Sequence, residues 1–231
     1  MSNNNNIMNF YETKAVKKHN VQYHNPNYKN SGVKHPFRMV VVAPSGSGKT
    51  NATLNIIQKL DDTFEHIYVC TKMPNEPLYK YLQDALKDQI TFYSDLSEMP
   101  DARDLEVLGQ TLVIYDDMVN EHNLSKVKDM FMMGRKINTF GCSMMFLSQS
   151  YFSIPTFIRK NTNYITILKL SGKRDLNLIL SEFSLGVDKD ELIEMYKNAI
   201  KKKLDFFKID VETENDNMRF SHNFTDYFQI E

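Results

Sequence analysis

The sequence predicts an α/β fold, a three-layer sandwich in which helices cover both faces of a mostly parallel central sheet. Two observations predict it. Six short runs are apolar without interruption, as in strands buried on both faces of a sheet, and stretches of helical periodicity lie between them. This alternation is typical of parallel sheets with helical crossovers. The expected strands are residues 37–43, 66–71, 90–93, 111–115, 143–147 and 164–168.

Every expected strand except the third is followed directly by a stretch with helical periodicity. After the last of these stretches, two short apolar runs flank a polar turn at residues 212–216, which predicts a hairpin at the edge of the sheet from residues 206–211 and 217–220. The expected helices are residues 49–60, 77–86, 124–133, 154–160, 174–183 and 189–201.

The composition indicates one domain with tails. The chain has 231 residues, 42% of them hydrophobic, which suffices for one sizeable core. A net charge of −1 excludes a general attraction to nucleic acid or membranes, so such a partner needs a local patch. No apolar run reaches the roughly 18 residues of a membrane span, and the start shows no signal-peptide pattern. We expect an intracellular protein without a membrane span, with Cys70 and Cys142 as buried thiols.

Residues 1–34 are rich in Asn, Lys and Tyr and lack helical or strand periodicity, which predicts a flexible arm ahead of a domain formed by residues 35–231. Residues 1–38 contain a single acidic residue, Glu12. Two interpretations remain open, a solvated tail without a partner or a segment that contacts DNA or another subunit. The basic residues of this region are Lys14, Lys17, Lys18, Lys29, Lys34 and Arg38.

Residues 43–50, APSGSGKT, follow an expected strand and open an expected helix, the context in which a Walker A phosphate loop (P-loop) is informative. Gly46 and Gly48 allow the backbone N–H groups to surround an anion, Lys49 reaches the β- and γ-phosphates of ATP, and the Thr50 hydroxyl binds Mg²⁺. Ala43 replaces the first glycine of the motif, a position that only needs a tight exit from the strand. The alternative is a chance Ser/Gly-rich loop. The expected nucleotide-binding residues are Pro44, Ser45, Gly46, Ser47, Gly48, Lys49 and Thr50.

Residues 112–117 form an apolar strand that ends in two acids, the Walker B pattern. Asp116 is expected to hold Mg²⁺ through water, and Asp117 to orient or deprotonate the attacking water. A plain strand-end turn is the alternative, since Asp is common there. The second acid, and the two expected strands between the motifs, favour the ASCE or RecA-like ATPase branch of the P-loop NTPases.

Gln149 lies two residues after the expected strand 143–147, at the end of the strands where Asp117 is expected. There it can contact the γ-phosphate or the attacking water, although a plain strand-end polar residue is the alternative. Arg135 and Arg159 are candidates for stabilising charge at the phosphates of a neighbouring subunit, and we prefer Arg135. Either arginine is also consistent with a solvated surface residue.

With these motifs in place, the sequence resembles the genome-packaging ATPases of large DNA viruses, the poxvirus-type, giant-virus and virophage enzymes of the FtsK–HerA superfamily. The resemblance covers about residues 35–225. The segments that carry it are residues 36–50, 113–117, 134–136, 146–155 and 158–161, with 173–175, 191–196 and 206–210 in the C-terminal part.

The resemblance implies a ring-forming homo-oligomer, a pentamer or hexamer, that uses ATP and Mg²⁺ to thread double-stranded DNA into a preformed capsid. It implies a capsid or virion component and a location in the virion or the host-cell cytoplasm. By resemblance, Gln149 senses the γ-phosphate and Arg135 matches the approximate place of the finger that acts in trans. Cellular members of the superfamily usually carry Glu where this chain has Asp117.

A DNA motor needs cationic contacts to phosphates and no base-reading motif. The arm, residues 169–174 (KLSGKR) and the lysines of residues 201–203 supply such charges, although the last run also fits a solvated helix end. Two other functions remain open. A small-molecule kinase needs a lid rich in arginine, which we do not find in the sequence. A switch protein binds ATP without hydrolysis, against which the intact motifs count.

Overall fold

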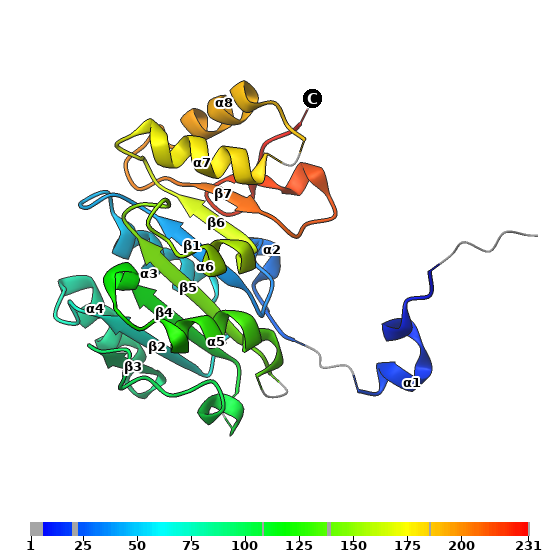
Figure 1. Cartoon of the computed structure of the whole chain (residues 1–231), viewed down its shortest axis with the longest axis vertical. Helices are drawn as coiled ribbons and strands as arrows, with labels where there is room; N and C mark the ends of the chain where they lie inside the picture. Colours follow the sequence, from blue (N-terminus) through cyan, green and yellow to red (C-terminus); the bar gives the residue numbers. More distant parts are fainter. Residues whose placement is uncertain (1–6, 20–22, 108, 138–139, 185, 231) are drawn as a thin grey trace, which may run out of the picture.

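The computed structural model describes residues 7–19, 23–107, 109–137, 140–184 and 186–230. Within them lies a nine-stranded sheet of strand order β3-β2-β4-β5-β1-β6-β7-β8-β9 (Figure 1). The first six strands are parallel to one another, and the last three run antiparallel to their neighbours. The strands are β1 Arg38–Val42, β2 His66–Thr71, β3 Ile90–Tyr93, β4 Thr111–Asp116, β5 Cys142–Ser148, β6 Tyr164–Ile167, β7 Phe207–Asp210, β8 Phe220–His222 and β9 Asp226–Tyr227.

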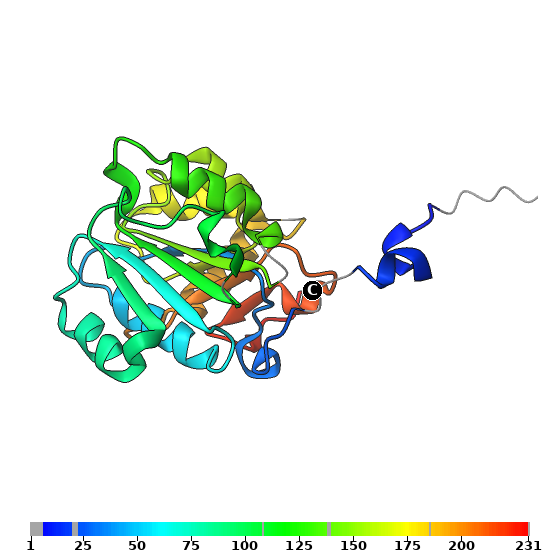
Figure 2. The same cartoon turned by 90° about the horizontal axis from the view of Figure 1, so that it is seen from below.

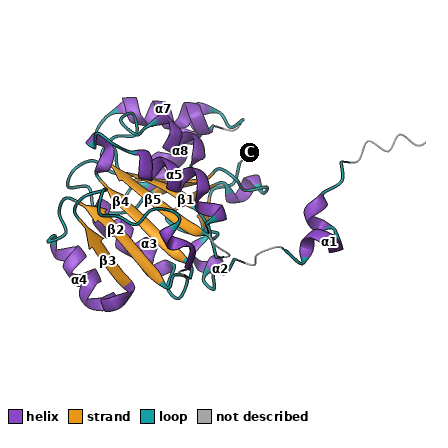
Figure 3. Cartoon of the chain, turned by 60° about the horizontal axis from the view of Figure 1, so that its bottom comes forward, coloured by secondary structure: helices purple, strands orange, loops and turns teal. Residues whose placement is uncertain are grey.

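Helices cover both faces of this sheet, which confirms the predicted three layers (Figures 1 and 3). The α-helices are α1 Lys14–Lys17, α2 Tyr28–Ser31, α3 Lys49–Lys59, α4 Pro77–Leu86, α5 Ser125–Met133, α6 Thr156–Asn161, α7 Lys173–Phe183 and α8 Lys189–Ala199. Short 3₁₀ turns are η1 Phe10–Glu12, η2 Lys87–Gln89, η3 Asp104–Val107, η4 Met118–Asn120, η5 Gly134–Lys136 and η6 Asp216–Met218.

The continuous apolar runs of the strands supply two cores, one on each face. Along β1, Val40 and Val42 belong to the core between the sheet and helices α5 to α8. Met39 and Val41 belong to the core between the sheet and helices α3 and α4. Every residue of β1, β4, β5 and β6 is buried, because both faces are covered.

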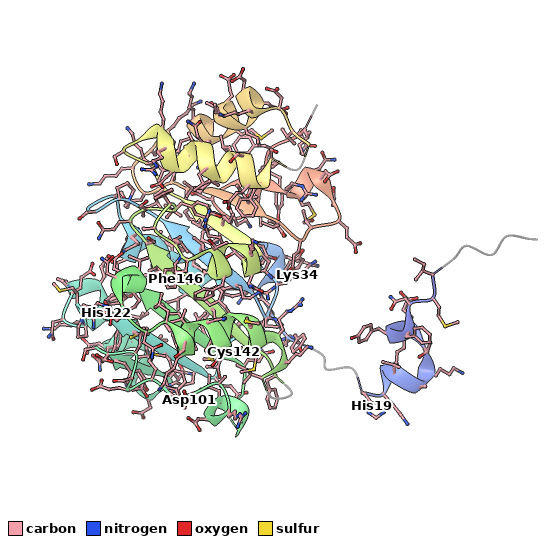
Figure 4. All side chains as sticks on the ribbon, viewed as in Figure 1. His19, Lys34, Asp101, His122, Cys142 and Phe146 are labelled. Carbon is pink, nitrogen blue, oxygen red and sulfur yellow. The ribbon has the colours of Figure 1, made fainter. Side chains whose placement is uncertain are left out.

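The two cysteines are buried, as predicted. Cys142 begins β5, and Phe146 lies further along the same strand in the middle of the molecule (Figure 4). Burial raises the pKa of Cys70 and of Cys142 to about 12, so both thiols stay protonated at neutral pH.

The element boundaries follow the sequence prediction closely, with one larger difference at the C-terminal end. The second strand of the predicted hairpin begins at Phe220 and not at Asn217, because residues 216–218 form the 3₁₀ turn η6. A further short strand, β9, extends the edge and has no counterpart in the prediction.

The N-terminal segment also differs from the predicted boundary at residue 34, because residues 23–34 pack on the domain. Ser31 and Val33 are each 1% exposed. The buried ammonium of Lys208 on β7 donates to the carbonyls of Ser31 and Gly32 and to that of Phe224 near the C-terminal end. The three carbonyls thus have a hydrogen-bond donor inside the protein. The composition of residues 23–34 does not reveal this packing.

The preceding described residues, 7–19, have no buried side chain, and α1 lies apart from the sheet in Figures 1 and 2. His19, labelled in Figure 4, marks this segment. Its flexibility stays a prediction. Over the parts of the chain that the structure describes, no helix is long and apolar enough to cross a membrane.

The N-terminal edge of the parallel strands is closed by buried polar side chains that bind the backbone. Asn163 Oδ1 accepts from the backbone N–H of Arg38 at 2.7 Å. The ring of His35 contacts Ser143 Oγ through Nδ1 at 2.8 Å and the Phe140 carbonyl through Nε2 at 2.9 Å. Since a carbonyl only accepts, Nε2 carries a proton, and in the neutral ring Nδ1 then accepts from the Ser143 hydroxyl. Burial lowers the pKa of His35, which is consistent with that form.

Candidate functional site

The C-terminal ends of β1, β4 and β5 meet at one edge of the sheet, beside a cavity of about 360 Å³. Strand β5 lies between the strands that carry the two Walker motifs, so the residue after β5 is a direct neighbour of both. The cavity is lined by Pro44, Ser45, Gly46, Gly48, Lys49, Thr50, Asn51, Thr71, Lys72, Met73, Glu76, Leu78, Asp116, Asp117 and Gln149.

The segment between β1 and α3 has the backbone of a phosphate loop. Gly46 and Gly48 have φ values of 73° and 99°, in the left-handed region where side chains are strained. Ala43 lies outside that region and extends β1, its N–H bonding the Ser148 carbonyl at 3.0 Å. Its methyl group is therefore tolerated at the position that the motif usually gives to glycine. Helix α3 begins at Lys49, so its N-terminal N–H groups face the loop.

The ammonium group of Lys49 joins the two motifs. It lies 2.8 Å from Asp116 Oδ1 and also forms an ion pair with Asp117 Oδ2. The side chains of Lys49 and Asp116 are 10% and 8% exposed, whereas that of Asp117 is 37% exposed. One ammonium group thus contacts both carboxylates, and the phosphates of a nucleotide would compete with them for its charge.

Asp116 is held from the side opposite Lys49. Its Oδ2 atom accepts from the Tyr79 hydroxyl at 2.8 Å and from Thr71 Oγ1 at 3.4 Å. Burial and the neighbouring Asp116 raise the pKa of Tyr79 far above its usual value, so the phenol stays a donor. Thr50 Oγ1 donates to Glu76 Oε2 at 3.1 Å, which brings another carboxylate to the hydroxyl of the P-loop.

Gln149 lies next to Asp117, as the strand-end argument predicts. Its Nε2 donates to Asp117 Oδ2 at 3.0 Å. Asp117 has a left-handed backbone, with φ of 57°, and its N–H bonds the Leu147 carbonyl on β5 at 3.1 Å. A non-glycine residue in this region indicates a strained position held by its surroundings. Its carboxylate is therefore fixed between Lys49 and Gln149.

Three residues of the site escaped the sequence prediction. Thr71 ends β2, so the strand-end argument applied to Gln149 would have found it. Glu76 and Tyr79 belong to the start of α4, and no strand-end or motif signal marks them. Their place depends on how α4 packs on the sheet.

Arg135 lies at the N-terminal ends of the parallel strands, opposite the C-terminal ends that border this cavity. It belongs to η5, before β5, and its carbonyl accepts from the Tyr23 hydroxyl at 2.8 Å. It borders a cavity of about 560 Å³ with residues at the N-terminal ends of β1 and β6, among them His35 and Tyr164. Arg135 therefore does not reach the P-loop of its own chain, and its side chain is exposed.

Arg159 does not line the nucleotide cavity either. Its guanidinium pairs with Glu182 on α7 and lies 5.4 Å from the centre of the Tyr151 ring. The Tyr151 hydroxyl donates to the same carboxylate at 2.7 Å. To act on a neighbouring subunit, Arg159 would have to leave these partners.

Two of the cationic segments lie at the same edge as the P-loop. Residues 169–172 follow β6, and α7 begins with Lys173 and Arg174, where the Arg174 guanidinium lies 3.7 Å from the centre of the exposed Phe152 ring. Lys201, Lys202 and Lys203 connect α8 to β7 and border a cavity beside Ser47.

The parallel sheet, the P-loop with its left-handed glycines and the paired aspartates at the end of β4, one strand removed from β1, define a P-loop nucleoside triphosphatase fold. The family follows from comparison with known proteins. The model of the poxvirus A32 protein family matches residues 25–211, and the chain belongs to this family.

Two curated relatives carry the same description. The chain is 28% identical over 201 residues to the DNA packaging protein OPG160 of Monkeypox virus, which covers 80% of this chain and 62% of that protein. It is also 28% identical over 175 residues to the protein of that name from Vaccinia virus (strain Copenhagen), with coverage of 69% and 63%. The chain thus spans about three fifths of the length of these relatives.

Solved structures share the fold at low sequence identity. The genome packaging NTPase B204 of Sulfolobus turreted icosahedral virus 2, in complex with ATP-gammaS, matches with a TM-score of 0.58 and 16% identity over 78% of this chain and 94% of that one. The conjugation coupling protein TcpA of pCW3 with ATPgS matches with a TM-score of 0.51 and 11% identity over 84% and 61%.

Proposed function

We propose that the chain is an ATPase that drives double-stranded DNA into a preformed viral capsid. The observation that carries the proposal is the contact of Gln149 with Asp117 beside Lys49, at the mouth of a P-loop. The names of the relatives, DNA packaging proteins of poxviruses, support the DNA substrate. The same resemblance supports a place in the virion or in the host-cell cytoplasm.

In the proposed reaction, ATP lies along the P-loop with its γ-phosphate towards Asp117 and Gln149. Lys49 exchanges its carboxylate partners for the β- and γ-phosphates. Asp117 then accepts a proton from a water molecule as the water oxygen bonds to the γ-phosphorus, and the bond to the bridging oxygen breaks to release ADP. Gln149 holds Asp117 and the water in line, and loses the γ-phosphate as a neighbour after hydrolysis.

Mg²⁺ fits the donor atoms at this site. Among the described residues no group of three or more His, Cys, Asp or Glu side chains is arranged to hold a metal. Nucleotide-bound Mg²⁺ needs no such group, because the phosphates and water fill most of its positions. The Thr50 hydroxyl and the Asp116 carboxylate border the cavity, and both are the hard oxygen donors that Mg²⁺ prefers. Bound there, Mg²⁺ would neutralise charge on the phosphates.

Packaging also requires an assembly around DNA, and we propose a ring of five or six identical chains. Neither arginine candidate borders the nucleotide cavity of its own chain, as a residue that acts in trans requires. Arg135 is exposed, whereas Arg159 is paired with Glu182. We therefore retain Arg135 as the first candidate for the finger.

Steady-state phosphate release with and without double-stranded DNA tests the function. We expect hydrolysis of ATP that double-stranded DNA stimulates irrespective of its sequence. Stimulation by a nucleoside or a small acid, with transfer of phosphate to it, would support the small-molecule kinase instead. Binding of ATP without turnover under either condition would support the switch protein.

A mixing experiment tests the ring. Arg135→Ala should lose hydrolysis by roughly 10³-fold while it still binds ATP. Mixed with Lys49→Ala, it should regain part of the activity, because the neighbour supplies the finger to an intact P-loop. If Arg159→Ala complements in this way and Arg135→Ala is active alone, the finger is Arg159. If no mixture complements, the active site is complete within one chain.

A further inference from the structure

A second cavity, of about 250 Å³, lies on the other side of the P-loop from the aspartates. Its lining brings together Ser47 of the P-loop, Lys169 after β6 and the segment that connects α8 to β7. In that segment Ile200 and Leu204 supply apolar surface, and three lysines stand at the rim. Apart from Ser47, which belongs to the P-loop, the hydrolysis described above uses none of these residues.

The order of the strands fixes which end of a nucleotide faces this cavity. Asp117 and Gln149 follow β4 and β5, on one side of β1, whereas β6 and β7 lie on the other side (Figure 1). A triphosphate with its γ end at Asp117 crosses the P-loop in front of β1. Its α-phosphate, and whatever is attached to it, must then leave on the side of β6 and β7.

Leu204 connects the cavity directly to the P-loop. Its side chain lies so close to Gly48 that a Cβ atom at that glycine would overlap Leu204 Cδ2. The backbone of Leu204 is left-handed, with φ of 77°, an unusual conformation for leucine. The side chain is still 41% exposed, so its remaining apolar surface faces the cavity region and not the core.

The neighbouring Asp205 explains how this conformation is held. Its Oδ1 accepts from Asn223 Nδ2 at 3.1 Å, and its Oδ2 lies 3.1 Å from His222 Nε2. Both oxygens of the carboxylate are thus engaged within the chain. Asp205 anchors the segment to β8, and Leu204 beside it is left to contact a ligand.

We propose that this cavity binds the nucleoside part of ATP, base and ribose, and that Leu204 packs against the base. The proposal rests on the proposed ATPase function, which assigns residues to the phosphates of ATP, and adds a binding site for the nucleoside. A flat aromatic base suits an apolar surface, and lysine ammonium groups at the rim suit the face of a base and the nearby α-phosphate. The sequence predicted that the lysines of residues 201–203 contact DNA or end a helix. In this proposal they lie beside the bound nucleotide.

The test compares two ligands that differ only in the nucleoside. Leu204→Asn keeps the size of the side chain, removes its apolar character and suits a left-handed backbone better than leucine does. By calorimetry, we expect the variant to bind Mg–ATP about tenfold more weakly, the loss of part of one apolar contact. Its affinity for Mg–tripolyphosphate, which has no nucleoside, should equal that of the wild type. Met132→Asn, an exposed apolar residue on α5, is the matched control.

Turnover adds a second readout. Because a uniform binding contact is lost, the KM for ATP should rise about tenfold while kcat stays unchanged. Equal losses for ATP and tripolyphosphate would show that Leu204 only supports Gly48, and unchanged affinity for both would show that the cavity takes no nucleoside; either result overturns the proposal. If the wild type binds neither ligand, the proposed ATPase function itself is contradicted.

Discussion

The two edges of the parallel sheet both bury polar groups, but they satisfy them differently. At the C-terminal edge, Lys49 forms ion pairs with two carboxyl groups, those of Asp116 and Asp117. At the N-terminal edge, Asn163 Oδ1 accepts from the backbone N–H of Arg38, and the ring of His35 contacts the Phe140 carbonyl and the Ser143 hydroxyl. A lysine that pairs with carboxylates can exchange them for an arriving anion, whereas side chains that bind the backbone hold the chain itself.

The difference indicates where function and stability lie in this molecule. Changes at the C-terminal edge should alter nucleotide chemistry with little effect on folding. Changes at the N-terminal edge should alter folding with little effect on nucleotide affinity. The following predictions are ordered from the largest expected effect to the smallest.

Lys49→Ala should reduce ATP hydrolysis to background and weaken ATP binding, because it removes the charge that the β- and γ-phosphates need. Phosphate release and calorimetric ATP binding measure the two effects. Lys80→Ala, an exposed lysine on α4, is the control and should match the wild type. Full hydrolysis by Lys49→Ala would mean that the cavity at the P-loop is not the catalytic site.

Asp117→Asn should bind ATP and Mg²⁺ and hydrolyse ATP roughly 10²-fold more slowly, as the loss of a positioned base predicts. Single-turnover hydrolysis of bound ATP measures the effect without the binding step. Asp116→Asn, in contrast, should bind Mg²⁺ more weakly, so that hydrolysis needs a higher Mg²⁺ concentration. If the two variants exchange these behaviours, the metal-binding and base roles are reversed.

Asn163→Ala should destabilise the fold by about 2 kcal/mol, because it leaves the buried N–H of Arg38 without its acceptor. Nucleotide affinity should not change. Urea unfolding, with Asn55→Ala on the exposed face of α3 as the control, measures the loss. A variant of full stability but reduced ATP affinity would contradict the division between the two edges.

The stability of the wild type should fall as the pH drops below about 6.5, in part because of His35. Burial lowers the pKa of His35 in the folded state, so the unfolded chain takes up the proton first and is favoured by acid. The loss from this residue is at most about 1.4 kcal/mol per pH unit, the limit for one proton.

His35→Gln should flatten this pH dependence although it lowers the overall stability. His66, whose pKa burial also lowers, contributes in the same direction and remains in the variant, so the difference between the two profiles isolates His35. Parallel profiles for the wild type and His35→Gln between pH 7 and 5 would show that His35 does not contribute.

The sequence predicted the C-terminal edge well because a strand end is a local signal. An uninterrupted apolar run followed by a polar residue places Asp116, Asp117 and Gln149 at one edge of a parallel sheet, provided the strands pair in the right order. It did not predict Glu76 or Tyr79, because their contacts with Thr50 and Asp116 depend on how α4 packs against the strands.

The N-terminal edge and the segment before it were harder to predict for the same reason. The contacts of Lys208 with Ser31 and Gly32 join residues about 177 positions apart. Local composition indicates a solvated arm there, and the packing that overrides it is not visible in any local pattern. The position of Arg135 at this edge, in contrast, follows from its place in the turn before β5.

The structure of the chain with Mg²⁺ and a non-hydrolysable ATP analogue tests the contrast between the edges most directly. We predict that the Lys49 ammonium leaves Asp117 and contacts the β- and γ-phosphates, while Asn163 still accepts from the Arg38 N–H. A structure in which Lys49 keeps both aspartates and the phosphates bind elsewhere would contradict the account.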